Sequence, residues 1–185
     1  MKKILTIIIF NLIIVSYSMA SEQLKYETID VNEVYEIRKY SDRLVVETET
    51  SNQNSNFRKL FNYISGSNEE NQEIKMTAPV TQIEKNGNMT MQFYLPSKFD
   101  ENNVPSPTNS DVKVLNMKGG YFAAITYSGR ASDKNFIKHK EILENQLKKD
   151  NIPILSPAIR ATYNSPFTLP MLRRNEVMFE IEKNI

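Results

Sequence analysis

Cysteine and tryptophan are absent from this 185-residue sequence, and histidine occurs once. Without cysteine the chain can form no disulfide, no thiolate metal site and no lipid-modified N-terminal cysteine, and it has no cysteine nucleophile. A single histidine also excludes a metal centre that takes two imidazoles from one chain. The stability of the fold must therefore come from its hydrophobic core.

An excess of charge of one sign is missing as well. The chain has 23 basic and 22 acidic residues, which gives a formal net charge of +1. Its short basic pairs, Lys148-Lys149 and Arg173-Arg174, stand close to acidic residues. Nucleic-acid binding usually needs a clustered basic surface, so we expect no nucleic-acid partner.

Familiar catalytic motifs are missing too. The sequence has no HExxH zinc motif, no phosphate-binding loop, no dinucleotide-binding glycine motif and no nucleophile elbow. Glu47 and Glu49 share one face of a predicted strand, and alternating acids of this kind usually face solvent. We therefore expect a protein that is not an enzyme. A hydrolase that uses paired carboxylates is the remaining enzymatic alternative.

The first residues of the chain differ from the rest. Two lysines precede an apolar run over residues 4–15, and small residues follow up to Ala20, which predicts a signal peptide over residues 1–20. The run is shorter than the roughly 20 residues that cross a bilayer, so we expect cleavage after Ala20 and no stable membrane anchor. Residues 21–185 would then be periplasmic or secreted. Their net charge would be −1, because the leader takes away two lysines and no acid.

The mature chain begins with strand patterns and a helix. Segments 35–37 and 44–46 alternate apolar and polar residues on either side of a Ser-Asp turn, which predicts a hairpin. An amphipathic helix follows, with Ser55 as its predicted N-cap and Gly66 as its stop. The apolar stripe of this helix consists of Phe57, Leu60, Phe61 and Ile64. Two further strands are predicted over 76–83 and 89–95.

After a loop-forming segment over residues 100–110 the same order recurs. Two strands, a helix capped by Ser132 and two final strands are predicted over 112–114, 121–127, 132–149, 159–163 and 177–181. Neither half alone buries both its sheet face and its helix stripe. The sequence therefore predicts an α+β fold, a distorted antiparallel β-barrel with two flanking helices, built from a ββαββ duplication.

Four residue strings go beyond these general patterns. They are YEIRKY (35–40), FRKLFNYISG (57–66), KMTAPV (75–80) and RRNEV (173–177), and together they resemble the SOUL haem-binding protein family. The strings follow the family's order over nearly the whole mature chain. The resemblance implies one domain over residues 21–185, with a distorted antiparallel barrel, two flanking helices and an internal repeat. It also implies haem or a related tetrapyrrole as a non-covalent ligand.

The resemblance leaves iron ligation open. Family members often end the last motif with tryptophan, where this chain has Met178, and no histidine lies near the first helix. His139, between Phe136 and Leu143 on the stripe of the second helix, is the candidate metal ligand. The alternative is a structural histidine that forms a hydrogen bond between helix and sheet, which is the commoner role of an isolated histidine.

The first helix is the predicted first wall of a ligand site. Phe57 and Phe61 offer an apolar surface, and Arg58 and Lys59 can pair with the propionates of haem. The alternative is that the two phenylalanines belong to the core and that the two cations are solvated.

The string SPFTLPML over residues 165–172 is the predicted second wall. Its two prolines predict a loop, and exposed Phe167, Met171 and Leu172 would call for a ligand or partner to cover them. The alternative is that these side chains cover the end of the barrel. Arg173, Arg174 and Glu176 stand at the entry to the last predicted strand. They could meet the propionates of haem, but we expect most of them to pair with neighbouring acids across the sheet.

The function that these features favour is an exported carrier, scavenger or buffer of haem or another tetrapyrrole. It would hold the ligand in an apolar cleft by shape and by pairing between propionates and cations. The alternative is a binding module for other amphipathic small molecules or for a protein partner, without a role in haem binding.

Overall fold

The computed structural model describes residues 21–50, 53–85 and 87–182, and the predicted signal peptide lies outside them. The strands of the main sheet are β2 (Glu27–Val31), β3 (Glu36–Tyr40), β4 (Arg43–Thr50), β6 (Val80–Lys85), β7 (Asn88–Tyr94), β8 (Val112–Met117), β9 (Gly120–Tyr127), β10 (Ile159–Thr162) and β11 (Asn175–Ile181). The helices are α1 (Gln53–Ile64) and α2 (Asp133–Lys149). A parallel pair of short strands, β1 (Glu22–Gln23) and β5 (Thr77–Ala78), lies apart from the main sheet.

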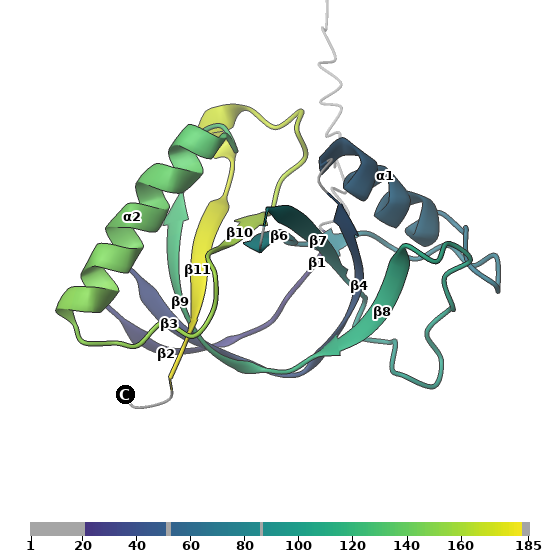
Figure 1. Cartoon of the computed structure of the whole chain (residues 1–185), viewed down its shortest axis with the longest axis horizontal. Helices are drawn as coiled ribbons and strands as arrows, with labels where there is room; N and C mark the ends of the chain where they lie inside the picture. The colour runs from purple at the N-terminus through teal and green to yellow at the C-terminus, as the bar shows by residue number, and fades with distance from the viewer. Residues whose placement is uncertain (1–20, 51–52, 86, 183–185) are drawn as a thin grey trace, which may run out of the picture.

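The nine strands of the main sheet run in the order β2-β3-β9-β11-β10-β6-β7-β4-β8, and every neighbouring pair is antiparallel. The sheet curls into a half-barrel, and the two helices cover its outer face (Figure 1). The predicted α+β class and distorted antiparallel barrel are therefore confirmed.

The strand order also reveals the duplication. The first repeat contains β3, β4, α1, β6 and β7, and the second contains β8, β9, α2, β10 and β11. Exchanging each strand for its counterpart in the other repeat turns the order β3-β9-β11-β10-β6-β7-β4-β8 into its own reverse. The two repeats are thus related by a pseudo-twofold arrangement, centred where β10 pairs with β6.

The predicted hairpin between segments 35–37 and 44–46 is wrong. β3 pairs with β2 and β9, whereas β4 pairs with β7 and β8. The first strand of each repeat is added to the strands of the other repeat, so the turn after Tyr40 crosses between the two halves of the sheet. Alternation of apolar and polar residues identifies a strand but does not identify its partner.

Of the three helix ends predicted from the sequence, one is wrong and two are confirmed. α1 begins at Gln53, so Ser55 lies inside the helix and the predicted N-cap is wrong. Most residues of the string SNQNSN are N-cap types, so composition could not single out one of them. Gly66 follows the helix with a φ of +104°, which confirms it as the stop. Ser132 caps α2 as predicted, because its side chain accepts a hydrogen bond from the Asn135 backbone N–H.

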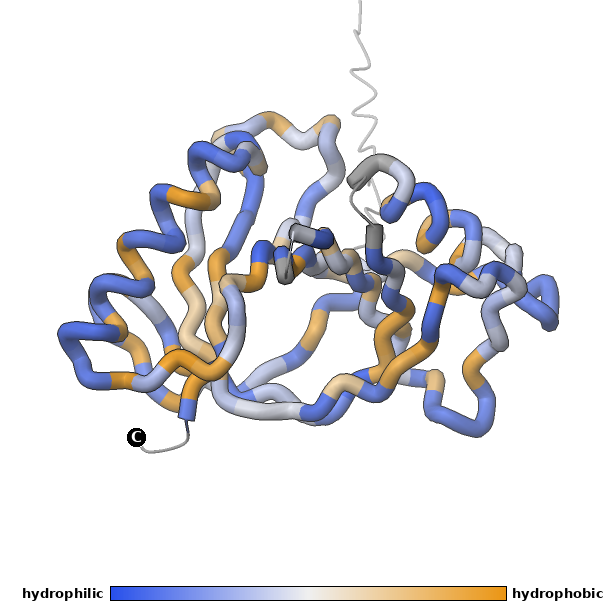
Figure 2. The backbone as a smooth tube through the Cα atoms, in the orientation of Figure 1, coloured by the Kyte–Doolittle hydropathy of each residue, from blue (hydrophilic) through white to orange (hydrophobic). Residues whose placement is uncertain are grey.

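Each helix closes a core of its own on the outer face. α1 packs through Leu60, Tyr63 and Ile64 against β4, β7 and β8, and α2 packs through Leu143 and Leu147 against β9 and β11. Both helices alternate blue and orange along their length in Figure 2, as amphipathic helices do. No helix within the described part of the chain is long and apolar enough to span a bilayer.

The two connections that cross between the repeats touch one another. The Asp42 carboxylate accepts hydrogen bonds from the Gly119 N–H and from the Lys118 ammonium, each at 2.8 Å. A Cβ at Gly119 would collide with the backbone of Tyr40 and Ser41. Glycine is therefore required where the second connection passes over the first.

We predict that Gly119→Ala lowers the free energy of unfolding by about 1–3 kcal/mol, because backbone atoms cannot make room for a methyl group. Urea denaturation measures the change. Gly120→Ala is the matched control, since its added Cβ would meet its nearest neighbour, a Glu180 oxygen, at 3.4 Å. Similar losses in both variants would contradict the close crossing.

Candidate ligand-binding site

The two helices leave the middle of the outer face between them. Because α1 packs on β4, β7 and β8 and α2 packs on β9 and β11, the central strands β6 and β10 lie in the space between the helices. One row of paired residues runs across this region in the order Phe93, Val80, Thr162, Asn175 and Tyr127. The positions of the predicted site residues are given relative to this row.

Phe57 and Phe61 form the flank of α1 that faces the central strands, called here the phenyl flank. The Phe57 ring packs against Phe93 of β7 with centroids 5.3 Å apart, and Phe61 stacks on Phe57 at 6.0 Å. The two side chains remain 43% and 49% exposed, so they contribute to both core and surface. Arg58, the next residue along the helix, is exposed beside them.

Lys59 lies on the opposite flank of α1. Its ammonium pairs with the Asp111 carboxylate at 2.8 Å, next to the start of β8. Positions 57 and 59 are about 200° apart around a helix. The structure therefore does not bring Lys59 to the phenyl flank, and Arg58 is the cation of this pair that stands beside Phe61.

The segment between β10 and β11, residues 163–174, is the predicted loop and is called here the apolar loop. A short 3₁₀ helix, η1 (Pro170–Leu172), occupies its second half. Its large hydrophobic side chains are exposed, with fractions of 94% for Phe167, 59% for Leu169, 73% for Met171 and 68% for Leu172. These side chains do not cover the end of the barrel, so the alternative to a ligand-facing loop is wrong for them.

Hydrogen bonds to the backbone carbonyls of the apolar loop hold it in place. The Arg173 guanidinium donates to the carbonyls of Thr168 and Pro166, and the Gly129 N–H donates to the Pro170 carbonyl at 2.8 Å. Arg173 therefore acts within the loop, and its guanidinium is engaged there.

The sheet register relates the apolar loop to the phenyl flank. Thr162, the last residue before the loop, pairs with Val80, and Val80 pairs with Phe93, the ring beneath Phe57. Two strand spacings therefore separate the root of the loop from Phe93, about 10 Å along the sheet. In Figure 1 the loop and the N-terminal end of α1 both stand at the upper edge of the molecule, and the loop shows orange segments there in Figure 2.

His139 lies at the far end of the same row. Its ring stacks on Tyr127 with centroids 4.0 Å apart, and its Nδ1 lies 2.7 Å from the Asn135 carbonyl. Since a carbonyl accepts only, Nδ1 carries the proton. Four strand spacings, about 19 Å, separate Phe93 from Tyr127, so the structure does not bring His139 to the phenyl flank. Iron ligation by His139 stays a prediction, and His139 is not part of the site beside the phenyl flank.

A buried carboxylate ties down both ends of the apolar loop. Glu176 is fully buried on the inner face of the sheet and accepts six hydrogen bonds. Tyr163 donates at 2.8 Å from the first residue of the loop, and Arg174 donates twice, at 2.9 and 2.7 Å, from the last. Arg174 therefore pairs with an acid, as expected, but that acid lies two positions along the same segment and not across the sheet.

Arg38 completes this network from β3. Its guanidinium donates to both Glu176 oxygens, at 2.8 and 3.1 Å, although the two residues are 138 positions apart. Burial alone would raise the pKa of the Glu176 carboxyl, yet the hydrogen bonds and charge of Arg38, together with those of Arg174, hold that pKa below its ordinary value. Burial raises the pKa of Tyr163 far above its ordinary range, so the phenol stays protonated and donates.

This network joins two of the strings that carry the resemblance, because Arg38 belongs to YEIRKY and both Arg174 and Glu176 belong to RRNEV. A family model described as SOUL heme-binding protein matches residues 21–180 of the chain. The chain belongs to the SOUL haem-binding protein family. The predicted resemblance is therefore confirmed.

Two individual relatives are named for haem binding as well. Human heme-binding protein 2 is 31% identical over 167 residues, which cover 81% of this chain and 78% of that protein. Mouse heme-binding protein 2 is 31% identical over 164 residues with the same coverage.

Solved structures of distant sequence share the fold. The C-terminal domain of EcmrR has a TM-score of 0.60 at 11% identity, covering 85% of this chain and 98% of that domain. A hydrolase from Listeria innocua has a TM-score of 0.56 at 9% identity, covering 82% and 93%. At such low identity these likenesses concern the architecture alone.

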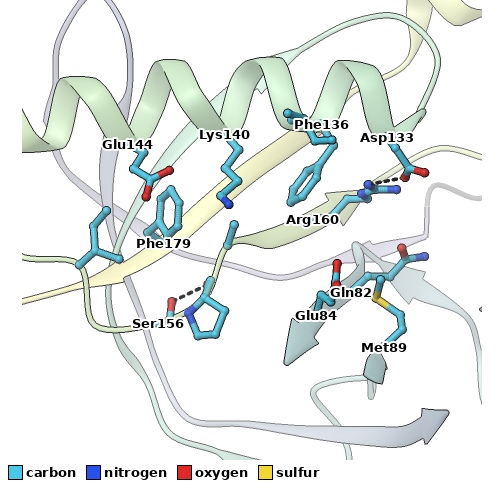
Figure 3. A pocket seen from close by; sticks show the side chains of 14 residues that line it. Gln82, Glu84, Met89, Asp133, Phe136, Lys140, Glu144, Ser156, Arg160 and Phe179 are labelled. Carbon is cyan, nitrogen blue, oxygen red and sulfur yellow. Dashed lines mark hydrogen bonds and ion pairs between the residues drawn. The ribbon is translucent and has the colours of Figure 1, made fainter. Parts of the chain in front are cut away.

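Two groups of residues were not recognised as sites from the sequence. Arg38 was part of a motif string, but nothing in its local sequence indicated a partner 138 residues away. The cavity beside α2 in Figure 3, which Lys140 and Arg160 help to line, combines residues from α2, β6 and β10. No spacing rule within one segment detects a cavity assembled in this way.

We predict that Glu176→Gln lowers the free energy of unfolding at neutral pH by about 3–5 kcal/mol, because Arg38 and Arg174 lose their buried counter-charge. A native pKa below the unfolded value stabilises the fold above about pH 4.5, and this contribution is lost as pH falls through the native pKa. Urea denaturation across this range should show a smaller acid-induced loss in the variant. Glu180→Gln, in the same strand, is the control, and an equal effect would contradict the account.

Proposed function

We propose that the protein is an exported binding protein for haem or a related tetrapyrrole, acting as a carrier, scavenger or buffer. The observation that carries this proposal is the apolar loop, whose four large hydrophobic side chains are exposed on a segment anchored at both ends. Exposed apolar side chains gathered in this way usually mark a binding surface. The names of the human and mouse relatives and of the family support haem as the ligand.

The residues fit a flat apolar ligand with a charged edge. The phenyl flank offers two ring faces, and Phe167, Met171 and Leu172 of the apolar loop offer the opposite wall. Arg58 stands at the outer edge of the phenyl flank, where it can pair with a propionate. Haem would supply a large apolar plate, and shape and charge would hold it without a histidine ligand at this site.

Neither catalysis nor nucleic-acid binding is part of this proposal. The family supports a ligand-binding role. The same exposed residues also fit the alternative, a module that binds other amphipathic molecules or a protein partner. The distance of His139 from the phenyl flank favours that alternative over a haem site that depends on iron.

A haemin titration separates these possibilities. We expect a saturable change in the absorption spectrum at micromolar protein, with Leu172→Ser weakening binding by roughly tenfold because an apolar contact is lost. Leu155→Ser is the matched control, since Leu155 is also an exposed leucine, at 54%, outside the apolar loop.

Arg58→Glu should weaken haemin binding more than Lys148→Glu on α2. A folded protein without a saturable change would refute haem binding, and equal losses in each pair would refute this site.

Export has its own test. We expect the protein isolated from its own host to begin at Ser21, because residues 1–20 have the pattern of a cleaved leader. N-terminal sequencing of the protein from separated cell fractions measures this. An intact Met1 on the accumulated protein, or its recovery from the cytoplasm alone, would refute export.

A further inference from the structure

A cavity of about 920 Å³ lies beside α2 (Figure 3). One stripe of α2 lines it from above, and strands β6, β7, β10 and β11 and the segment 154–158 form the other walls. None of its lining residues belongs to α1 or to the apolar loop. Small-molecule sites commonly have volumes of about 300–1,000 Å³, so this cavity is large enough for a ligand of its own.

The walls of the cavity are apolar over part of their area. Phe136 and Ile137 come from α2, Phe179 from β11, Ile154 from the segment before β10, and Met89 from β7. Ile137 is 49% exposed, and in Figure 3 the rings of Phe136 and Phe179 lie along the same side of the space. An aliphatic or aromatic body that covered these side chains would remove apolar surface from water.

Two cations reach into the cavity. The Arg160 side chain is 12% exposed, its guanidinium lies 4.3 Å from the centroid of the Phe136 ring, and one of its nitrogens lies 2.7 Å from Asp133. Lys140 is half-buried and points into the space in Figure 3. Within the described ranges Lys140 has no ion pair or hydrogen bond. Its ammonium is therefore available to an acceptor.

The acidic residues of the cavity are more exposed than its two cations. Asp133 is 83% exposed at its side chain, and Glu84 and Glu144 are exposed as well. Solvent and salt screen exposed charges more than charges that are partly buried. The two cations are therefore screened less than Glu84 and Glu144, whereas Asp133 is already paired with Arg160 at 2.7 Å. The exposed carboxylates would repel a second negative charge on a bound molecule.

We propose that this cavity, between Lys140 of α2 and Arg160 of β10, binds a small amphipathic monoanion that has one carboxylate and one apolar body. The carboxylate accepts hydrogen bonds from the two cations, and the body lies along Phe136, Ile137 and Phe179. This second site is separate from the proposed haem site. A dianion with charges at both ends fits less well, because its outer charge would meet Glu84 and Glu144.

Calorimetric titration of the haem-free protein with decanoate and decylammonium tests the sign of the charge, because the two probes share one chain and differ in their head group. We expect saturable, equimolar binding of decanoate and much weaker binding of decylammonium. Decanedioate should bind less tightly than decanoate. Absence of saturable decanoate binding, or tighter binding of decylammonium, would overturn the proposal.

Variants of α2 test the location. Lys140→Glu should weaken decanoate binding by about tenfold or more, since a charge-assisted hydrogen bond is replaced by repulsion. Lys140→Arg should retain binding. Lys138→Glu is the matched control, because Lys138 is exposed on the same helix and does not line the cavity. Equal losses at positions 138 and 140 would overturn the assignment. Because no haem is present, failure of the haem proposal would leave this result unaffected.

Discussion

The carboxylate of Glu176 is the interaction on which the proposed site depends. It is fully buried, and removing a carboxylate from water is unfavourable unless hydrogen bonds and opposite charges replace the water. Here six hydrogen bonds do so, from Arg38, Thr126, Tyr163 and Arg174. Because two of these donors begin and end the apolar loop, the same contacts that neutralise the buried charge also hold both ends of the loop.

The pseudo-twofold arrangement explains why both proposed sites lie on the outer face. Each repeat places its helix over its own strands, so β6 and β10, which meet at the centre, have a helix on either side of them. The sides of the two helices that face each other border a common region above these strands. Phe57 and Phe61 lie on that side of α1, and Lys140 lies on that side of α2. The two proposed sites occupy different parts of it, one beside α1 and the apolar loop and one beside α2.

Local patterns predicted much of this fold correctly. Helical spacing around Leu60, the stop at Gly66, the cap at Ser132 and the recurrence of ββαββ all depend on neighbouring residues, and all are confirmed. The predicted hairpin between β3 and β4 was wrong because each of these strands pairs with a strand of the other repeat, through contacts far apart in sequence. Exposure of the apolar loop could be expected, since two prolines and a run of hydrophobic residues fit neither a helix nor a strand.

The site was harder to predict than the fold for the same reason. Arg58 and Lys59 look like one cationic pair in the sequence. Adjacent residues on a helix point in different directions, however, and only Arg58 stands beside the phenyl flank. His139 fell on the apolar stripe in sequence, yet its exact angle around α2 places it against Tyr127. The ion network and the α2 cavity required the tertiary structure, because their members come from strands and helices of both repeats.

The central claim is that the phenyl flank and the apolar loop together hold a planar tetrapyrrole. Amide chemical shifts of the protein, recorded while metal-free protoporphyrin IX is added, test it most directly because this probe is diamagnetic and needs no iron ligand. The account predicts that the largest shifts fall in α1 around Phe57 and in residues 163–174. Saturable binding whose largest shifts fall on the inner face of the sheet, with α1 and the loop unchanged, would contradict it.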